Sequence, residues 1–165
     1  MDIIKETLTW NDIEDFTSTI HFKIKMDNWR PDIIVGLTRG GLLPAKMLSH
    51  AMGVEMSALD VSLRDSKLIS PVTTWLPELA SKDGIKILVV DDINDTGATF
   101  AWIKKDWSST LRISIDEWPS DKIKFAALIH NEPSPVPTDY WAKSINKDKD
   151  PIWINFPYEV WHKNR

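Results

Sequence analysis

The chain has no cysteine among its 165 residues, so its own side chains cannot form a disulfide bond or a thiolate metal site. Glycine is scarce, with six residues, and none of them directly precedes a lysine. This excludes the phosphate-binding loop of P-loop ATPases, which needs Gly-x-x-x-x-Gly-Lys-Ser/Thr. No apolar run approaches the roughly 20 residues that a membrane-spanning helix needs. The N-terminus mixes charges without an apolar stretch, so we expect no signal peptide.

Positive charge is not concentrated anywhere in the chain. The net charge is −4 and there is no lysine–arginine block, which argues against a nucleic-acid binder. With 42% hydrophobic and 27% charged residues the composition is that of an ordinary globular protein. The length suits one domain with a real core. We therefore expect a single domain over residues 1–165, without nucleic-acid or membrane partners and with a cytoplasmic location.

The stretch from Lys86 to Phe100 carries the strongest functional signal. Ile87–Val90 is an unbroken apolar run, which predicts a strand buried on both faces of a parallel sheet. The run ends on Asp91 and Asp92, and residues 94–99 (Asn-Asp-Thr-Gly-Ala-Thr) then predict a tight turn into a helix. The first amides of a helix lack internal partners and carry partial positive charge. The turn therefore suits an anion such as phosphate.

The residue types in this stretch suit the parts of a sugar phosphate. Gly97 lets the backbone come close to a bound group, and Thr96 and Thr99 add hydroxyl donors. Asp91 and Asp92 are poorly suited to phosphate, but they can accept hydrogen bonds from a diol or hold Mg²⁺ directly or through water. A ribose 5-phosphate has this combination of groups. A purely structural turn is the alternative interpretation.

Residues 89–99, Val-Val-Asp-Asp-Ile-Asn-Asp-Thr-Gly-Ala-Thr, resemble the phosphoribosyl-pyrophosphate (PRPP) motif of the type I phosphoribosyltransferases. The resemblance implies that Asp91 and Asp92 contact the ribose hydroxyls and Mg²⁺. It also implies that Asp95 lies near N7 of a purine base and accepts or donates its proton. The 5′-phosphate would lie in the loop formed by Asp95, Thr96, Gly97, Ala98 and Thr99.

A second strand–loop–helix unit lies earlier in the chain. Asp32–Leu37 predicts a core strand and Leu42–Met52 a helix, with Gly-Gly between them. Because Gly-Gly before a helix is common, the unit alone does not specify a ligand. Residues 31–45 nevertheless resemble the pyrophosphate loop of the same family. The resemblance implies a non-proline cis peptide near Thr38–Arg39 and pyrophosphate contacts from Thr38, Arg39 and Gly40, the arginine matching phosphate oxygens.

The apolar pattern breaks between residues 63 and 84. A loop this long in a compact domain is usually functional or disordered. In the family a mobile flap at this place closes over PRPP and excludes water, which competes with the base for the anomeric carbon. Arg64 and Lys67 are both candidates to reach pyrophosphate, and residues 76–80 predict one helical turn.

In the C-terminal tail, Asp139-Tyr140 precedes residues 153–157, Trp-Ile-Asn-Phe-Pro. This order resembles the base-binding hood of small microbial purine phosphoribosyltransferases of the xanthine–guanine and hypoxanthine type. The resemblance implies that Trp153 stacks on the purine, worth about 1–3 kcal/mol, and that Ile154 offers backbone contacts. A packing role for Trp153 is the alternative. The family has a lysine that donates to the purine O6, where this chain has Asn131, or His130 if the register slips. This departure leaves the identity of the base open.

Taken together, the sequence predicts an α/β fold of the type I phosphoribosyltransferase kind, a parallel sheet flanked by helices. The core would cover residues 30–130 and a small hood would come from the chain ends, 1–10 and 131–165. The predicted activity is Mg²⁺-dependent transfer of 5-phosphoribosyl from PRPP to a purine base, with PRPP and a nucleobase as partners. We also expect a homo-oligomer, a dimer or a tetramer. The alternatives are a phosphoribosyltransferase for another base and a non-catalytic PRPP-sensing regulator.

Overall fold

A computed structural model of the chain describes residues 3–61 and 75–162. Five strands form one sheet in the order β3-β2-β4-β5-β6, and each pair of neighbours is parallel. β1 and β7 form a separate two-stranded parallel sheet from the two chain ends. The predicted fold class is therefore confirmed. The elements in chain order are β1 (Ile4–Thr7), α1 (Trp10–Met26), β2 (Ile33–Thr38), α2 (Leu42–Met52), β3 (Glu55–Asp60), α3 (Trp75–Lys82), β4 (Ile87–Asn94), α4 (Ala98–Leu111), the 3-10 turn η1 (Ile115–Glu117), β5 (Ile123–Asn131), β6 (Tyr140–Ile145), β7 (Ile152–Asn155) and the 3-10 turn η2 (Pro157–His162).

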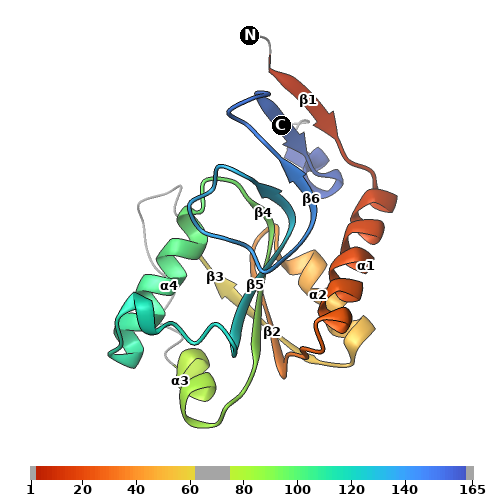
Figure 1. Cartoon of the computed structure of the whole chain (residues 1–165). Coiled ribbons are helices and arrows are strands. Elements are labelled where there is room, and N and C mark those ends of the chain that lie inside the picture. Colours follow the sequence, from red (N-terminus) through yellow and green to blue (C-terminus); the bar gives the residue numbers. More distant parts are fainter. Residues whose placement is uncertain (1–2, 62–74, 163–165) are drawn as a thin grey trace.

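Helices cover both faces of the large sheet (Figure 1): α1 and α2 lie on one face, α3 and α4 on the other. The side chains of β4 alternate between the two cores. Leu88 and Val90 pack with α1 and α2, whereas Ile87 and Val89 pack with α3 and α4. All four are fully buried, which is why this strand has to be apolar throughout. Within residues 3–61 and 75–162, no helix has both the length and the apolar character to cross a membrane.

Local chemistry sets the start of α1. The Thr9 side chain accepts from the Asp12 amide at 3.2 Å, and the Asp12 carboxylate accepts from the Thr9 amide at 2.7 Å. This reciprocal capping box satisfies amides that the first turn of a helix leaves unpaired. Ile13, Ile20 and Ile24 then bury one face of the helix against the sheet.

Segment 132–139 joins β5 to β6, although parallel strands usually need a longer crossover. It can be this short because it runs straight back beside β5, where the Asp139 amide donates to the Phe125 carbonyl at 2.9 Å. β6 consequently belongs to the large sheet. β1 and β7 form a sheet of their own, and the division into a core over 30–130 and a hood over 1–10 and 131–165 stays a prediction.

Two elements are longer than the sequence-based predictions. The helical turn predicted at residues 76–80 is a helix, α3 (Trp75–Lys82), which buries Leu76 and Ala80. Residues 63–74 of the predicted loop 63–84, with Arg64 and Lys67, lie outside the described residues. β4 continues past Val90 through the acid pair to Asn94, because its ladder with β5 continues to that residue. α4, the helix expected after the turn at residues 94–99, extends from Ala98 to Leu111.

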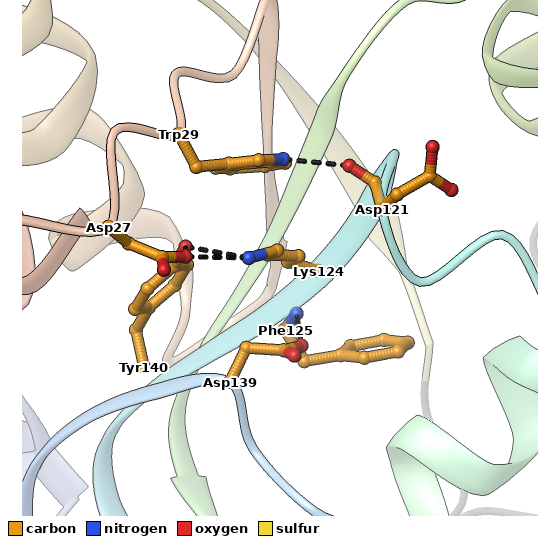
Figure 2. A network of polar contacts seen from close by, with 7 residues as sticks. All are labelled: Asp27, Trp29, Asp121, Lys124, Phe125, Asp139 and Tyr140. Atoms are coloured by element: carbon orange, nitrogen blue, oxygen red, sulfur yellow. Dashed lines mark hydrogen bonds and ion pairs between the residues drawn. The ribbon is translucent and has the colours of Figure 1, made fainter. Parts of the chain in front are cut away.

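A polar network ties α1 to the edge of the sheet where β5 and β6 begin (Figure 2). Lys124 Nζ donates to Asp27 Oδ2 at 2.7 Å and to Tyr140 Oη at 3.0 Å, and the Tyr140 hydroxyl donates to the same Asp27 oxygen at 2.5 Å. The ammonium also lies 5.2 Å from the ring centroid of Trp29, a cation–π contact. The hydrogen bond from Lys124 lowers the pKa of Asp27, while burial raises the pKa of Tyr140 to about 12. The network therefore stabilises the sheet at the edge opposite the carboxyl ends of its strands.

Candidate active site

Two loops meet at the carboxyl ends of β2 and β4, which are adjacent parallel strands. Open parallel sheets bind ligands at this edge. The loops touch at Gly40 and Asp92: a Cβ added to Gly40 would lie 1.9 Å from Asp92 Oδ2. Any side chain at position 40 would therefore displace the Asp92 carboxylate. The structure thus joins the predicted pyrophosphate loop to the predicted ribose-binding acids.

The loop after β2 contains the cis peptide expected at Thr38–Arg39. The Thr38 hydroxyl donates to Asp60 Oδ1, on β3, at 2.6 Å. A contact between Thr38 and a ligand would therefore come from the backbone. Arg39 is exposed and supplies the positive charge of this loop.

The turn after β4 presents the N-terminus of α4. Gly97 has φ +77°, and a Cβ there would lie 2.6 Å from Ser134 Oγ, so glycine is required for both conformation and space. Among the described residues, the amides of 95–99 make one side-chain hydrogen bond, from Ala98 N to Thr96 Oγ1 at 3.4 Å. At that length it competes weakly with an anion. The turn can therefore offer the amides and the positive helix end that an anion requires.

Beneath the turn, Asn94 fixes segment 132–139 in place. Its side chain is 3% exposed, and Nδ2 donates to Val136 O at 2.7 Å and to Thr138 Oγ1 at 2.8 Å. Its Oδ1 accepts from Ser134 Oγ at 3.2 Å. His130 belongs to the same network through a 3.0 Å contact with Thr138 Oγ1, and burial lowers its pKa. Asn94 was not predicted as a site residue, because its only signal in the sequence is a lone amide among acids at a strand end.

Asp92 is the enclosed member of the acid pair. Its Oδ2 accepts from the Tyr158 hydroxyl at 3.0 Å, and its amide donates to Asp91 Oδ1 at 2.9 Å. Burial raises the pKa of Asp92 to about 6, a rise that the Tyr158 hydrogen bond opposes and the Glu159 charge increases. Tyr158 belongs to η2, so the C-terminal part of the hood reaches the acids at the end of β4. Tyr158 also gave no signal in the sequence.

Asp95 lies between Asn131 and Lys147. Lys147 Nζ lies 2.6 Å from Asp95 Oδ2. Asn131 Nδ2 donates to the Asp95 carbonyl at 3.0 Å and contacts its Oδ1 at 3.4 Å, while Asn131 Oδ1 accepts from the Lys147 amide at 3.0 Å. Both ends of the Asn131 side chain are thus engaged by the protein, and that side chain is buried. Lys147 was not predicted as a site residue, because it lies in a polar loop without periodicity.

The acid pair offers only oxygen atoms to a metal ion. Within the part of the chain that the structure describes, no three histidine, aspartate or glutamate side chains form a metal-binding group. Mg²⁺ is usually held by one or two carboxylates together with substrate phosphates and water. Asp91 and Asp92 therefore fit an ion that binds together with its phosphorylated substrate.

The hood presents Trp153 to solvent and buries Ile154. The Trp153 side chain is 54% exposed, a large fraction for an aromatic ring, whereas Ile154 is 7% exposed and packs in the core. Successive side chains of a strand point to opposite faces, so Trp153 and Ile154 lie on opposite faces of the sheet that β7 forms with β1. Trp153 thus offers an aromatic surface, and contacts from Ile154 to a ligand would come from its backbone.

Comparisons with known proteins agree with this geometry. The family model for the phosphoribosyl transferase domain matches residues 4–164. A xanthine-guanine phosphoribosyltransferase from Gluconobacter oxydans is 26% identical over 158 residues, which cover 93% of this chain and 84% of that protein. The crystal structure of a purine phosphoribosyltransferase from Pyrococcus horikoshii is 25% identical with a TM-score of 0.67, over 94% of each chain. A Helicobacter pylori xanthine-guanine-hypoxanthine phosphoribosyltransferase shares the fold, with a TM-score of 0.71 over 97% of each chain at 23% identity.

Proposed function

The chain belongs to the phosphoribosyl transferase domain family of enzymes, and from that premise we propose that it transfers 5-phosphoribosyl from PRPP to a guanine-, xanthine- or hypoxanthine-type purine. Pyrophosphate is the other product. The contact between Gly40 and Asp92 carries the proposal, because it joins a cationic loop to an acid pair beside a helix N-terminus. The names of the Gluconobacter and Pyrococcus relatives support the purine class.

Each part of PRPP has a matching group at this edge of the sheet. The 5′-phosphate binds the amides and hydroxyls of residues 95–99 at the positive end of α4. The ribose hydroxyls donate to Asp91 and Asp92, at the end of β4. The pyrophosphate lies against residues 38–40, where Arg39 supplies the positive charge.

Asp91 and Asp92 are the residues that would hold Mg²⁺ through their ionised carboxylates. The ion would supply positive charge that stabilises the departing pyrophosphate. The tyrosine hydroxyl on Asp92 Oδ2 keeps that carboxylate directed toward the loop at Gly40. Burial raises the pKa of Asp92, and a cation held there would lower it, because a nearby positive charge favours the ionised form of a carboxyl group.

The transfer step forms one bond and breaks another at C1 of the ribose. The base N9 forms the new bond to C1 while the C1–O bond to pyrophosphate breaks, and its electron pair leaves with pyrophosphate. The proton on N7 of the base passes to the Asp95 carboxylate, so the purine ends neutral. Asn131 and Lys147 hold that carboxylate in place, so Asn131 acts as a positioning residue. The exposed ring of Trp153 stacks on the base.

The direct test measures pyrophosphate release from PRPP and Mg²⁺ with guanine, xanthine, hypoxanthine, adenine and uracil. Release with the first three supports the proposal, and release with uracil alone would favour a different base class. No release with retained PRPP binding in calorimetry would favour a PRPP-sensing regulator. A single domain, a homo-oligomer and a cytoplasmic location remain predictions; light scattering of the purified protein tests the oligomer.

Asp95→Asn tests the role of Asp95, because the amide keeps the shape of the side chain and removes its basicity. We expect kcat to fall by about 10²–10⁴-fold, the usual contribution of a general base, while the Kd for PRPP changes little. The matched control is Asp116→Asn, an exposed acid on η1, which should leave both values unchanged. Equal losses in kcat and PRPP affinity would contradict a proton role.

A further inference from the structure

We propose that Lys147 selects the base, and that it does so as a pair with Asp95. The Asp95 carboxylate accepts a hydrogen bond from an N–H group of the base. The neighbouring Lys147 ammonium donates a hydrogen bond to the adjacent atom of the base. Together they match a purine that carries a carbonyl oxygen at C6 and oppose one that carries an amino group there. This inference rests on the proposed function and names a specificity-determining residue of the same site.

The structure brings Lys147 to Asp95 from a distant loop. Residues 146–151 connect β6 to β7, and the Lys147 amide donates to Asn131 Oδ1 at the end of β5. The same loop is anchored again where Asn146 Nδ2 donates to Glu132 Oε2 at 2.9 Å. These bonds direct the Lys147 side chain inward, with 24% of it exposed, onto Asp95. A cation thus reaches the site although position 131 itself carries no charge.

Asn131 cannot substitute for that cation, because its amide is already bound at both ends. Nδ2 contacts the backbone and side chain of Asp95, and Oδ1 accepts from the Lys147 amide. At 6% exposure it is also buried beneath the pair. The hydrogen bonds of Asn131 hold Asp95 and Lys147 next to each other. Asp95 and Lys147 are therefore the groups that contact the base.

The chemistry of an ammonium group decides what can lie opposite it. Lys147 Nζ has three N–H donors and no acceptor, and Asp95 Oδ2 takes one of them. A carbonyl oxygen on the base can accept another. An amino group in that place would set donor against donor and leave both unpaired. A site built around a specific polar group rejects the analogue that lacks it by as much as about 10⁴-fold.

A purely structural ion pair is the competing explanation, and the two differ in what they predict for different bases. Exposed ion pairs contribute little to stability, and this pair is only partly buried, with 39% of the Asp95 side chain exposed. A structural role would lower transfer to every base by one factor, or change PRPP affinity. A selective role changes the ratio between bases and leaves PRPP affinity alone.

The test compares Lys147→Met, which keeps the length of the stem, with Lys147→Arg and the control Lys149→Met, an exposed lysine two residues on. We expect Lys147→Met to lower kcat/KM for hypoxanthine by about 100-fold or more, with adenine and the Kd for PRPP within about threefold. Lys147→Arg should restore part of the preference, and Lys149→Met should match the wild type. If the methionine variant does not fold, Lys147→Gln takes its place.

Equal losses for hypoxanthine and adenine, or no loss for hypoxanthine, would overturn the inference. If the wild type transfers no base at all, the proposed function fails by itself. The inference is then judged by calorimetric binding of inosine and adenosine 5′-monophosphates, which needs no turnover. A wild-type preference for the inosine nucleotide that Lys147→Met abolishes supports it, and the absence of any preference overturns it.

Discussion

Asp92 should destabilise the metal-free protein as the pH rises through 6. Burial raises the pKa of its carboxyl to about 6 from the ordinary 3.8. A carboxyl group whose pKa is higher in the folded than in the unfolded protein makes its full contribution to the unfolding free energy below the unfolded pKa, here 3.8. That contribution is lost as the pH rises through the folded pKa. One pKa unit corresponds to about 1.4 kcal/mol, so ionisation of Asp92 by pH 7.5 costs about 3 kcal/mol of unfolding free energy.

Asp92→Asn removes the titration and keeps an oxygen that can accept from the Tyr158 hydroxyl. In buffers containing EDTA, we expect the variant to be more stable than the wild type by about 3 kcal/mol at pH 7.5, a Tm about 6–12 °C higher. The difference should shrink toward pH 4. An unpaired amide N–H on the new side chain would lower the unfolding free energy of the variant by the same amount at every pH. The dependence of the stability difference on pH is therefore the diagnostic quantity.

The assay is urea unfolding of both proteins from pH 4 to pH 8, with Asp116→Asn as the control for removing an exposed carboxylate. The unfolding free energy of Asp116→Asn should change with pH in the same way as that of the wild type. Parallel curves for Asp92→Asn and the wild type would refute the reasoning, because they would show that Asp92 ionises as readily in the folded as in the unfolded chain. Transfer activity of Asp92→Asn should fall, which identifies the acid as a residue kept for its chemistry at a cost in stability.

Three further changes test other parts of the molecule. Gly97→Ala forces an L side chain to φ +77°, so we expect a stability loss of about 1–2 kcal/mol and weaker PRPP binding, and calorimetry showing unchanged affinity would contradict this. Asn94→Ala leaves buried partners unpaired, and urea unfolding should show a loss of about 1–3 kcal/mol; a smaller loss would mean that water replaces the amide. Lys124→Met breaks the contacts with Asp27 and Tyr140 at the opposite edge, so Tm should fall while kcat/KM stays constant. A fall in kcat/KM would place that network in the active site.

The sequence by itself determined the parts of this protein that depend on neighbouring residues. The apolar run Ile87–Val90 predicted a doubly buried strand because every position of it faces a core. Gly97 predicted the turn because few residues other than glycine adopt positive φ. The acids that follow the run predicted a diol or metal site because carboxylates offer only acceptors. Each of these inferences needs only the periodicity or the conformational limits of adjacent residues.

Only the tertiary structure decided which distant groups touch. Lys147 meets Asp95, and Tyr158 meets Asp92, because β6, β7 and η2 pack where they do. Nothing in the loop around Lys147 signals this, since a polar loop carries no period from which a direction can be inferred. The contacts of Asn131 have the same origin, because its neighbours in space, and not its neighbours in the chain, engage both ends of its amide. Contacts of this kind follow from strand order and register, which depend on the packing of the whole domain.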